Sequence, residues 1–226
     1  EYDLEAVEVR DTWKLESDNA VLSIRAVGQS MGKWWAATSD GIWSAAKESA
    51  FLGNPATWTQ SAALQPLAGP DFRDLVALDD GSLYALENRE GADAVWRSLD
   101  GGMTWEEASA GLDEEWRHLS TDGQGVWGST PFGLMEWDSN GAPGALINAA
   151  GNVFLEPMGL AAQDGSVWVA NAHSGTLMLS GETGQYAGPF APNGPRTNAC
   201  LRLDAWNEYL WVATGGTDAA GVPLYR

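Results

Sequence analysis

A short aromatic segment recurs five times along the chain at nearly even intervals. Its copies are centred on Trp35, Tyr84, Trp127, Trp168 and Trp211, and the spacings between them are 49, 43, 41 and 43 residues. Repeats of about 40–50 residues that contain several strand-like segments are typical of β-propeller blades. Helical repeats of this length would show an apolar period of 3.6 residues, which these segments lack. The repeat therefore predicts an all-β fold, a β-propeller.

Each unit divides into four predicted strands. In the second unit they are, from the innermost outward, FRDLVALDD, SLYALE, AVWRSLD and TWEEASA. The third unit repeats the scheme with EWRHLSTDG, GVWGSTP, GLMEWDS and GALINAA, and the fourth with MGLAAQDG, SVWVANA, GTLMLSG and GQYAGPF. We expect neighbouring blades to pack on both faces of each second strand, because that strand is a nearly continuous apolar run.

The two ends of the chain favour a closed ring. The N-terminal segment DTWKLES resembles an outermost strand, whereas ACLRLDAWN, EYLWVATG and GVPLYR near the C-terminus make three strands without a fourth. If the first strand pairs beside the last segment, the ring closes with five four-stranded blades and no unpaired edge. The alternative is part of a six- to eight-bladed ring, which would expose apolar blade faces at both ends. We expect the five-bladed ring, as a single domain over residues 1–226.

Composition supports the all-β prediction and argues against nucleic acid as a partner. The 226 residues include 27 Gly, 10 Pro and 13 Trp, which indicates many turns joined by short apolar segments. The formal net charge of -19 repels polyphosphates. Cys200 is the single cysteine, so no internal disulfide forms, and no apolar run approaches the length of a transmembrane helix. We expect a soluble segment, either processed or cut from a longer protein.

The segment from Ser98 to Trp105 fits the pattern Ser-x-Asp-x-Gly-x-Thr-Trp. It resembles the Asp box (BNR repeat) of propellers such as sialidases, sortilin-like receptors and photosystem assembly factors, where the box occupies the turn between the third and outermost strands. The resemblance implies a folding role, in which the Asp100 side chain accepts backbone N–H groups and Trp105 packs on the blade.

Two further resemblances suggest a bacterial envelope protein. The segment from Val126 to Leu134 resembles the Leu-Trp-x-Gly-Thr-x-x-Gly-Leu repeat of two-component-regulator propellers, which are common in envelope sensors, and the segment from Trp35 to Trp43 is a looser copy. The residues Pro192 to Pro195, with the segment from Leu210 to Gly216, are similar to PorZ-like surface proteins of the type IX secretion system in Bacteroidota. These resemblances imply a secreted, cell-surface or periplasmic location.

Few residue patterns in the sequence point to catalysis. His118 and His173 have no metal-ligand spacing, and no Gly-x-Ser-x-Gly nucleophile motif is present, so we expect no metal, no cofactor and no catalytic residue. The Asp-box resemblance nevertheless invites comparison with sialidases, in which an arginine triad grips the substrate carboxylate. Four arginines lie on predicted innermost strands: Arg25, Arg73, Arg117 and Arg202.

These four arginines have two interpretations. In the first, they form a positive ring around the central channel and attract an anionic ligand. In the second, they pair with nearby carboxylates such as Asp74, Glu115 and Asp204 and fill the channel. Loop residues at one face of the ring extend the candidate binding set: Phe132, His173, Asn193 and Arg196.

The sequence predicts a non-catalytic recognition platform that binds a protein or glycan partner at one propeller face, within a larger envelope complex. The alternative is a sialidase-like glycosidase or a lyase that acts on acidic saccharides.

Overall fold

The computed structural model describes most of the chain. The described residues are 15–17, 20–49, 51–61, 70–112, 114–148, 156–163, 165–172, 175–182, 184–190, 200–206 and 209–214, the last two ranges by their backbone.

Four four-stranded antiparallel sheets follow one another along the chain. The first contains β3 (Ile24–Ser30), β4 (Lys33–Thr38), β5 (Gly41–Ala46) and β6 (Thr59–Gln60). The second contains β7 (Asp71–Ala77), β8 (Leu83–Asn88), β9 (Ala94–Ser98) and β10 (Glu106–Glu107). The third contains β11 (His118–Thr121), β12 (Val126–Ser129), β13 (Gly133–Trp137) and β14 (Ile147–Asn148). The fourth contains β15 (Pro157–Gln163), β16 (Ser166–Asn171), β17 (Gly175–Ser180) and β18 (Tyr186–Phe190).

Two shorter sheets and one helical turn complete the described elements. β1 (Glu16–Ser17) pairs with β2 (Ala20–Val21), and β19 (Cys200–Trp206) pairs with β20 (Tyr209–Thr214) as the first two strands of a fifth unit. A 3-10 turn, η1 (Pro55–Thr57), precedes β6. Within the described residues, no helix has the length and apolar character needed to cross a bilayer.

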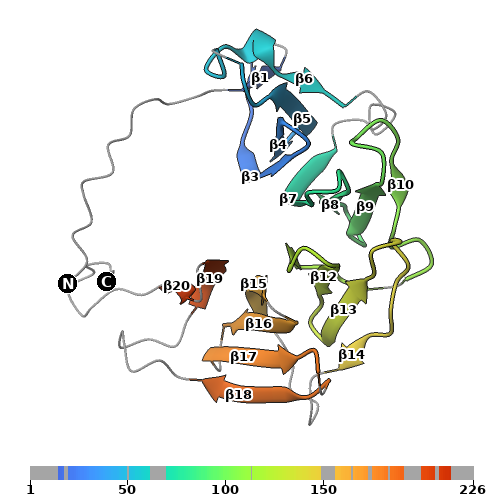
Figure 1. Cartoon of the computed structure of the whole chain (residues 1–226), viewed down its shortest axis with the longest axis vertical. Helices are drawn as coiled ribbons and strands as arrows, with labels where there is room; N and C mark the ends of the chain where they lie inside the picture. The colour runs from blue at the N-terminus through green and yellow to red at the C-terminus, as the bar shows by residue number, and fades with distance from the viewer. Residues whose placement is uncertain are drawn as a thin grey trace, which may run out of the picture.

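The four-stranded sheets and the pair of β19 and β20 stand around a common centre, each with its first strand innermost (Figure 1). From β3 to β7, β11, β15 and β19, each innermost strand lies beside the next. Every strand predicted in the second, third and fourth units is present and in the predicted order. The all-β propeller architecture is therefore confirmed.

In the first three blades, the second strand packs on both of its faces, as predicted. In β4, Trp35 joins a buried cluster with Phe72 of the second blade, while the adjacent Ala36 joins a different cluster with Trp58. Tyr84 and Trp127 occupy the position of Trp35 in their own blades, and each is buried against the following blade. The recurring aromatic is thus the side chain that fills the gap between one blade and the next.

Trp168 is less enclosed than its counterparts. It is half-buried on β16, and its ring lies 5.6 Å from that of Phe190. The two residues beside it, Val167 and Val169, are fully buried against the third blade. Side chains of β16 therefore alternate between its two faces as in the other blades. Val167 and Val169 face the third blade, and Trp168 lies on the opposite face.

The described end of the predicted N-terminal strand packs on the first blade. Leu15 is 1% exposed and shares a cluster with Leu22, Ala36 and Trp58, on the face of the first blade opposite to the second. Its carbonyl accepts the Leu22 N–H over 2.8 Å. The predicted closing pair involves residues 11–17 and 221–226. Its described end, Glu16–Ser17, pairs with Ala20–Val21. Residues 11–14 and 221–226 lie outside the described residues, so the closure and the count of five blades stay predictions.

Candidate functional site

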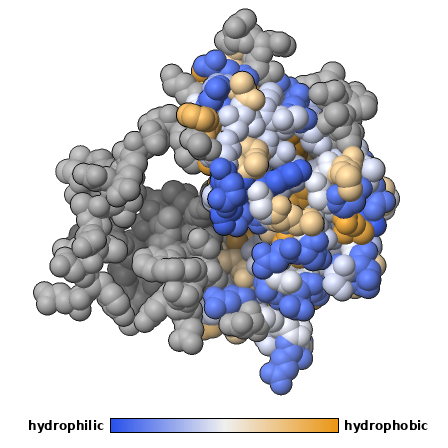
Figure 2. Space-filling model, turned by 45° about the horizontal axis from the view of Figure 1, so that its top comes forward, coloured by the Kyte–Doolittle hydropathy of each residue, from blue (hydrophilic) through white to orange (hydrophobic). Residues whose placement is uncertain are grey.

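One face of the ring carries the loops between the second and third strands of the blades. Because neighbouring strands are antiparallel, the innermost strands begin at this same face: Ile24 pairs with Thr38, and Asp71 pairs with Asn88. We call it the loop face. Figure 2 shows that hydrophilic side chains cover much of the described surface in that view, with smaller apolar areas between them.

A β-bulge interrupts the innermost strands at the same register position, close to the loop face. The residue without a pairing partner is Arg25 in β3, Arg73 in β7, Met158 in β15 and Leu201 in β19. Arg117 takes this position in the third blade, directly before β11, and its N–H donates to the Ser129 carbonyl over 2.8 Å. Bulges bend a strand and redirect its side chains, and they recur beside functional sites.

The register separates Arg202 from the other three predicted arginines, although all four belong to innermost strands or lie directly before one. Arg202 pairs with Ala213, so its position corresponds to Asp74 and His118 and lies one residue beyond the bulge. Only Arg25, Arg73 and Arg117 are equivalent to one another. The side chain of Arg202 lies outside what the structure describes.

Each of these three arginines forms an ion pair with a carboxylate of the chain. Arg25 Nε lies 3.0 Å from Asp71 Oδ1, and its Nη2 donates to Asp71 Oδ2 over 3.2 Å. Arg117 Nη2 lies 2.5 Å from Glu115 Oε1. We call the three arginines and their carboxylate partners the arginine rim. Pairing with Glu115 was among the predicted contacts, whereas Asp71 and the partner of Arg73 were not.

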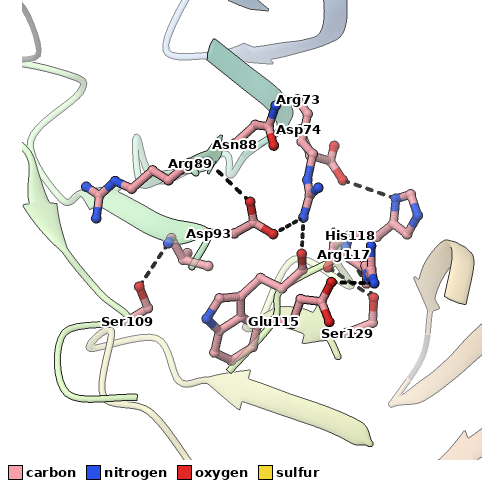
Figure 3. A network of polar contacts seen from close by, with 12 residues as sticks. Arg73, Asp74, Asn88, Arg89, Asp93, Ser109, Glu115, Arg117, His118 and Ser129 are labelled. Carbon is pink, nitrogen blue, oxygen red and sulfur yellow. Dashed lines mark hydrogen bonds and ion pairs between the residues drawn. The ribbon is translucent and has the colours of Figure 1, made fainter. Parts of the chain in front are cut away.

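Arg73 connects the second blade to the third (Figure 3). Its Nη2 donates to Asp93 Oδ2 over 2.6 Å and also to the carbonyl of Trp116, which leads into β11. Asp93 Oδ1 in turn accepts the Arg89 N–H over 3.3 Å. One guanidinium thus ties β7, the loop between β8 and β9, and the entry to the third blade.

His118 and Asp74 meet across the same boundary between blades. His118 Nδ1 lies 3.8 Å from Asp74 Oδ2, a contact that is ionic only when the imidazole is protonated (Figure 3). The same Asp74 oxygen accepts the Leu119 N–H over 2.9 Å. Asp74 therefore stabilises the packing of β7 against β11.

Phe132 is the exposed aromatic of the loop between β12 and β13. Its side chain is 58% exposed, and its N–H donates to the Thr130 hydroxyl over 3.1 Å, which shapes the turn. The other predicted loop residues, His173, Asn193 and Arg196, lie outside the described residues. Within the described part of the chain, no group of His, Cys, Asp and Glu side chains is arranged to hold a metal ion.

The turn between β9 and β10 lies on the opposite face and has the contacts expected of it. Asp100 accepts the N–H groups of Met103 and Thr104 over 3.0 and 2.9 Å. The Thr104 hydroxyl donates to it over 2.6 Å, and this contact contributes most to lowering the pKa of Asp100 to about 2. A hollow of about 270 Å³ lies against this turn, with Arg97, Trp105 and Glu106 in its wall.

The sequence matches no protein-family model and no curated protein. Solved structures share its fold. The extracellular domain of the putative one-component system BT4673 from B. thetaiotaomicron has a TM-score of 0.62 and 16% identity, with 88% of this chain and 27% of that chain covered. YCF48 bound to D1 peptide has a TM-score of 0.61 and 16% identity, with 89% and 63% covered. A luciferin-regenerating enzyme has a TM-score of 0.62 and 13% identity, with 92% and 77% covered. At these identities the likeness shows the β-propeller fold alone.

Proposed function

We propose that this propeller is a non-catalytic recognition module of the bacterial cell envelope or surface, which binds a protein or glycan partner at its loop face. The observation that carries the proposal is the exposure of Phe132 on the blade that also supplies Arg117 to the arginine rim. Aromatic and arginine side chains are the residues that most often dominate the energy of binding surfaces. A rigid ring with loops gathered on one face is suited to presenting them.

Two of the similar structures support this proposal. One is the extracellular domain of a putative one-component system, and the other is a propeller bound to a peptide. The present chain spans about a quarter of the length of the first. Because the chain matches only part of that protein, the proposal of an envelope location and a binding face concerns this propeller and not any larger protein.

The alternative is a propeller glycosidase or lyase that acts on acidic saccharides, and an enzyme is among the similar structures. That chemistry needs arginines whose guanidinium groups are available to the carboxylate of the substrate. Arg25, Arg73 and Arg117 each hold a carboxylate of the chain itself. A triad would need all three arginines to release these carboxylates, and Arg73 is held by both Asp93 and the Trp116 carbonyl. The arginine rim therefore favours recognition over catalysis.

A finer proposal is that the chain takes part in type IX secretion as a PorZ-like protein. It rests on the residues Pro192 to Pro195 and Leu210 to Gly216 of the sequence. Co-purification of the native protein with a sortase-like partner would support it, and a native protein found outside any secretion complex would exclude it.

The test of recognition is a binding screen with the labelled protein on peptide and glycan arrays. We expect ligands whose affinity falls by about tenfold or more in Phe132→Ser, since a buried aromatic anchor carries a large share of binding energy. The matched control is Phe51→Ser, because Phe51 is 72% exposed in the loop that leaves β5 at the opposite face. If every ligand binds both variants equally, the loop face is not the recognition surface.

A further inference from the structure

The three ion pairs of the arginine rim differ in how far water reaches them. In the pair of Arg73 and Asp93, the side chains are 24% and 9% exposed. In the pair of Arg117 and Glu115 they are 39% and 54% exposed. Exposed ion pairs contribute little net stability because water competes for both charges, whereas opening a buried pair leaves an uncompensated charge. In the pair of Arg25 and Asp71 they are 42% and 26% exposed, so the carboxylate is the less exposed partner there. The pair of Arg117 and Glu115, with both side chains well exposed, is therefore the one that opens at least cost.

The contacts of the three guanidinium groups point the same way. Arg73 is held by a carboxylate and also by the Trp116 carbonyl of the next blade. Arg25 contacts both oxygens of Asp71, through Nε and Nη2. Among the described residues, Arg117 has one ion pair, through a single nitrogen to a single oxygen of Glu115. A guanidinium presents five N–H donors in a planar fork, so Arg117 has the geometry to receive an incoming carboxylate.

Arg117 and Phe132 lie at the same corner of the third blade. The Arg117 backbone N–H donates to the carbonyl of Ser129, the last residue of β12, and Phe132 follows in the turn after it. That turn is fixed by the Thr130 hydroxyl, which accepts the N–H groups of Phe132 and Gly133 over 3.1 Å each. The two residues therefore lie at neighbouring backbone positions of the loop face.

We propose that Arg117 exchanges Glu115 for a carboxylate of the partner, while Phe132 contacts an apolar side chain next to that carboxylate. The ligand is an acidic peptide segment, since the phenyl ring of Phe132 offers apolar contact without a hydrogen-bonding group for sugar hydroxyls. Arg73 is a positioning residue that holds the second and third blades together. This inference rests on the proposed function of the loop face and gives it a ligand class.

The first experiment titrates acetate, as the simplest carboxylate, at constant ionic strength and follows the side-chain Nε–H signals of the arginines by NMR. We expect a saturable shift of the Arg117 signal and none of the Arg73 signal. Glu115→Gln removes the internal competitor and should lower the apparent Kd for acetate by about two- to fivefold, as befits an exposed ion pair. Glu90→Gln is the matched control, since it removes one exposed charge from the loop between β8 and β9.

If Glu90→Gln lowers the Kd for acetate as much as Glu115→Gln does, the gain comes from the change in net charge, and competition by Glu115 is contradicted. An unshifted Arg117 signal, or an equal response of Arg73, would overturn the exchange.

The second experiment compares a short peptide that ends in leucine and glutamate, its amidated glutamine counterpart, and a uronate disaccharide. We expect the acidic peptide to bind at least about tenfold more tightly than the other two and to lose that gain in Arg117→Gln and in Phe132→Ser. Equal or tighter binding of the disaccharide overturns the peptide assignment. If array ligands depend on Phe132 but bind Arg117→Gln normally, the recognition module stands and the exchange at Arg117 does not.

Discussion

Trp105 donates its indole N–H to the Ser61 hydroxyl over 3.1 Å, which binds the turn between β9 and β10 of the second blade to the first blade. The Trp105 ring also packs against the buried cluster that contains Trp35. The Asp-box-like turn thus stabilises the contact between the first and second blades as well as the second blade itself. Its stability should affect the whole ring, because each blade is held by its neighbours.

Asp100→Asn should destabilise the protein at neutral pH, because the carboxylate accepts hydrogen bonds from two backbone N–H groups and from the Thr104 and Ser98 hydroxyls. Its pKa is lowered from 3.8 to about 2, so its contribution is complete above pH 4 and is lost as the pH falls through about 2. We expect the difference in unfolding free energy between the two proteins to shrink over that interval. A difference that stays constant from pH 5 to about pH 2 would contradict this linkage.

Gly102→Ala should destabilise by about 2–4 kcal/mol, as measured by denaturant unfolding, because the cost of overpacking adds to that of the left-handed backbone. Gly102 has φ +81°, and a Cβ there would collide with the Trp35 ring of the first blade. Gly123→Ala is the matched control, because Gly123 has φ +87° but a Cβ there would meet no atom within 4 Å. The control should lose only the cost of the left-handed backbone, about 1 kcal/mol. Equal losses in the two variants would show that the contact with Trp35 is unimportant.

The blades were predictable from sequence because their signals are local. A run such as GVWGSTP combines a buried aromatic, small residues and a turn glycine within a few positions, and these determine the strand by themselves. The predicted strand order of the second, third and fourth units is accordingly confirmed. The exposed Phe132 follows from the same scheme, because a phenylalanine between Pro131 and Gly133 falls in a turn.

The arginine rim was only partly predictable because it depends on pairing between strands. A bulge places two residues of one strand opposite one residue of its partner, and no residue type marks where it falls. Nothing in the sequence therefore separates Arg73 at the bulge from Arg202 one position beyond it. The partner of Arg73 is Asp93, 20 residues along the chain, brought close by the loop between β8 and β9. The nearer Asp74, which was the predicted partner, accepts the Leu119 N–H.

Trp127→Ala should lower the free energy of unfolding by about 3–5 kcal/mol, since a large buried aromatic leaves a cavity that the blades cannot close. Trp127 is 5% exposed between the third and fourth blades. Trp168→Ala should cost less, because Trp168 is half-buried and its described aromatic contact is with Phe190 of its own blade. Urea denaturation of both variants measures which of them loses more unfolding free energy. A larger loss for Trp168 would mean that the fifth unit encloses it more fully than the described residues do.

Arg73→Ala should destabilise by about 2–3 kcal/mol, somewhat below the cost of breaking a fully buried pair. The change leaves Asp93, whose side chain is 9% exposed, without its guanidinium partner and frees the Trp116 carbonyl. Arg25→Ala is the matched control at the equivalent bulge, where the arginine is 42% exposed, and it should cost no more than about 1 kcal/mol. Thermal unfolding monitored by the near-ultraviolet signal of the tryptophans distinguishes the two. Equal losses would mean that the contacts of Arg73 with the third blade add nothing to stability, and that Arg73 and Arg25 contribute equally to it.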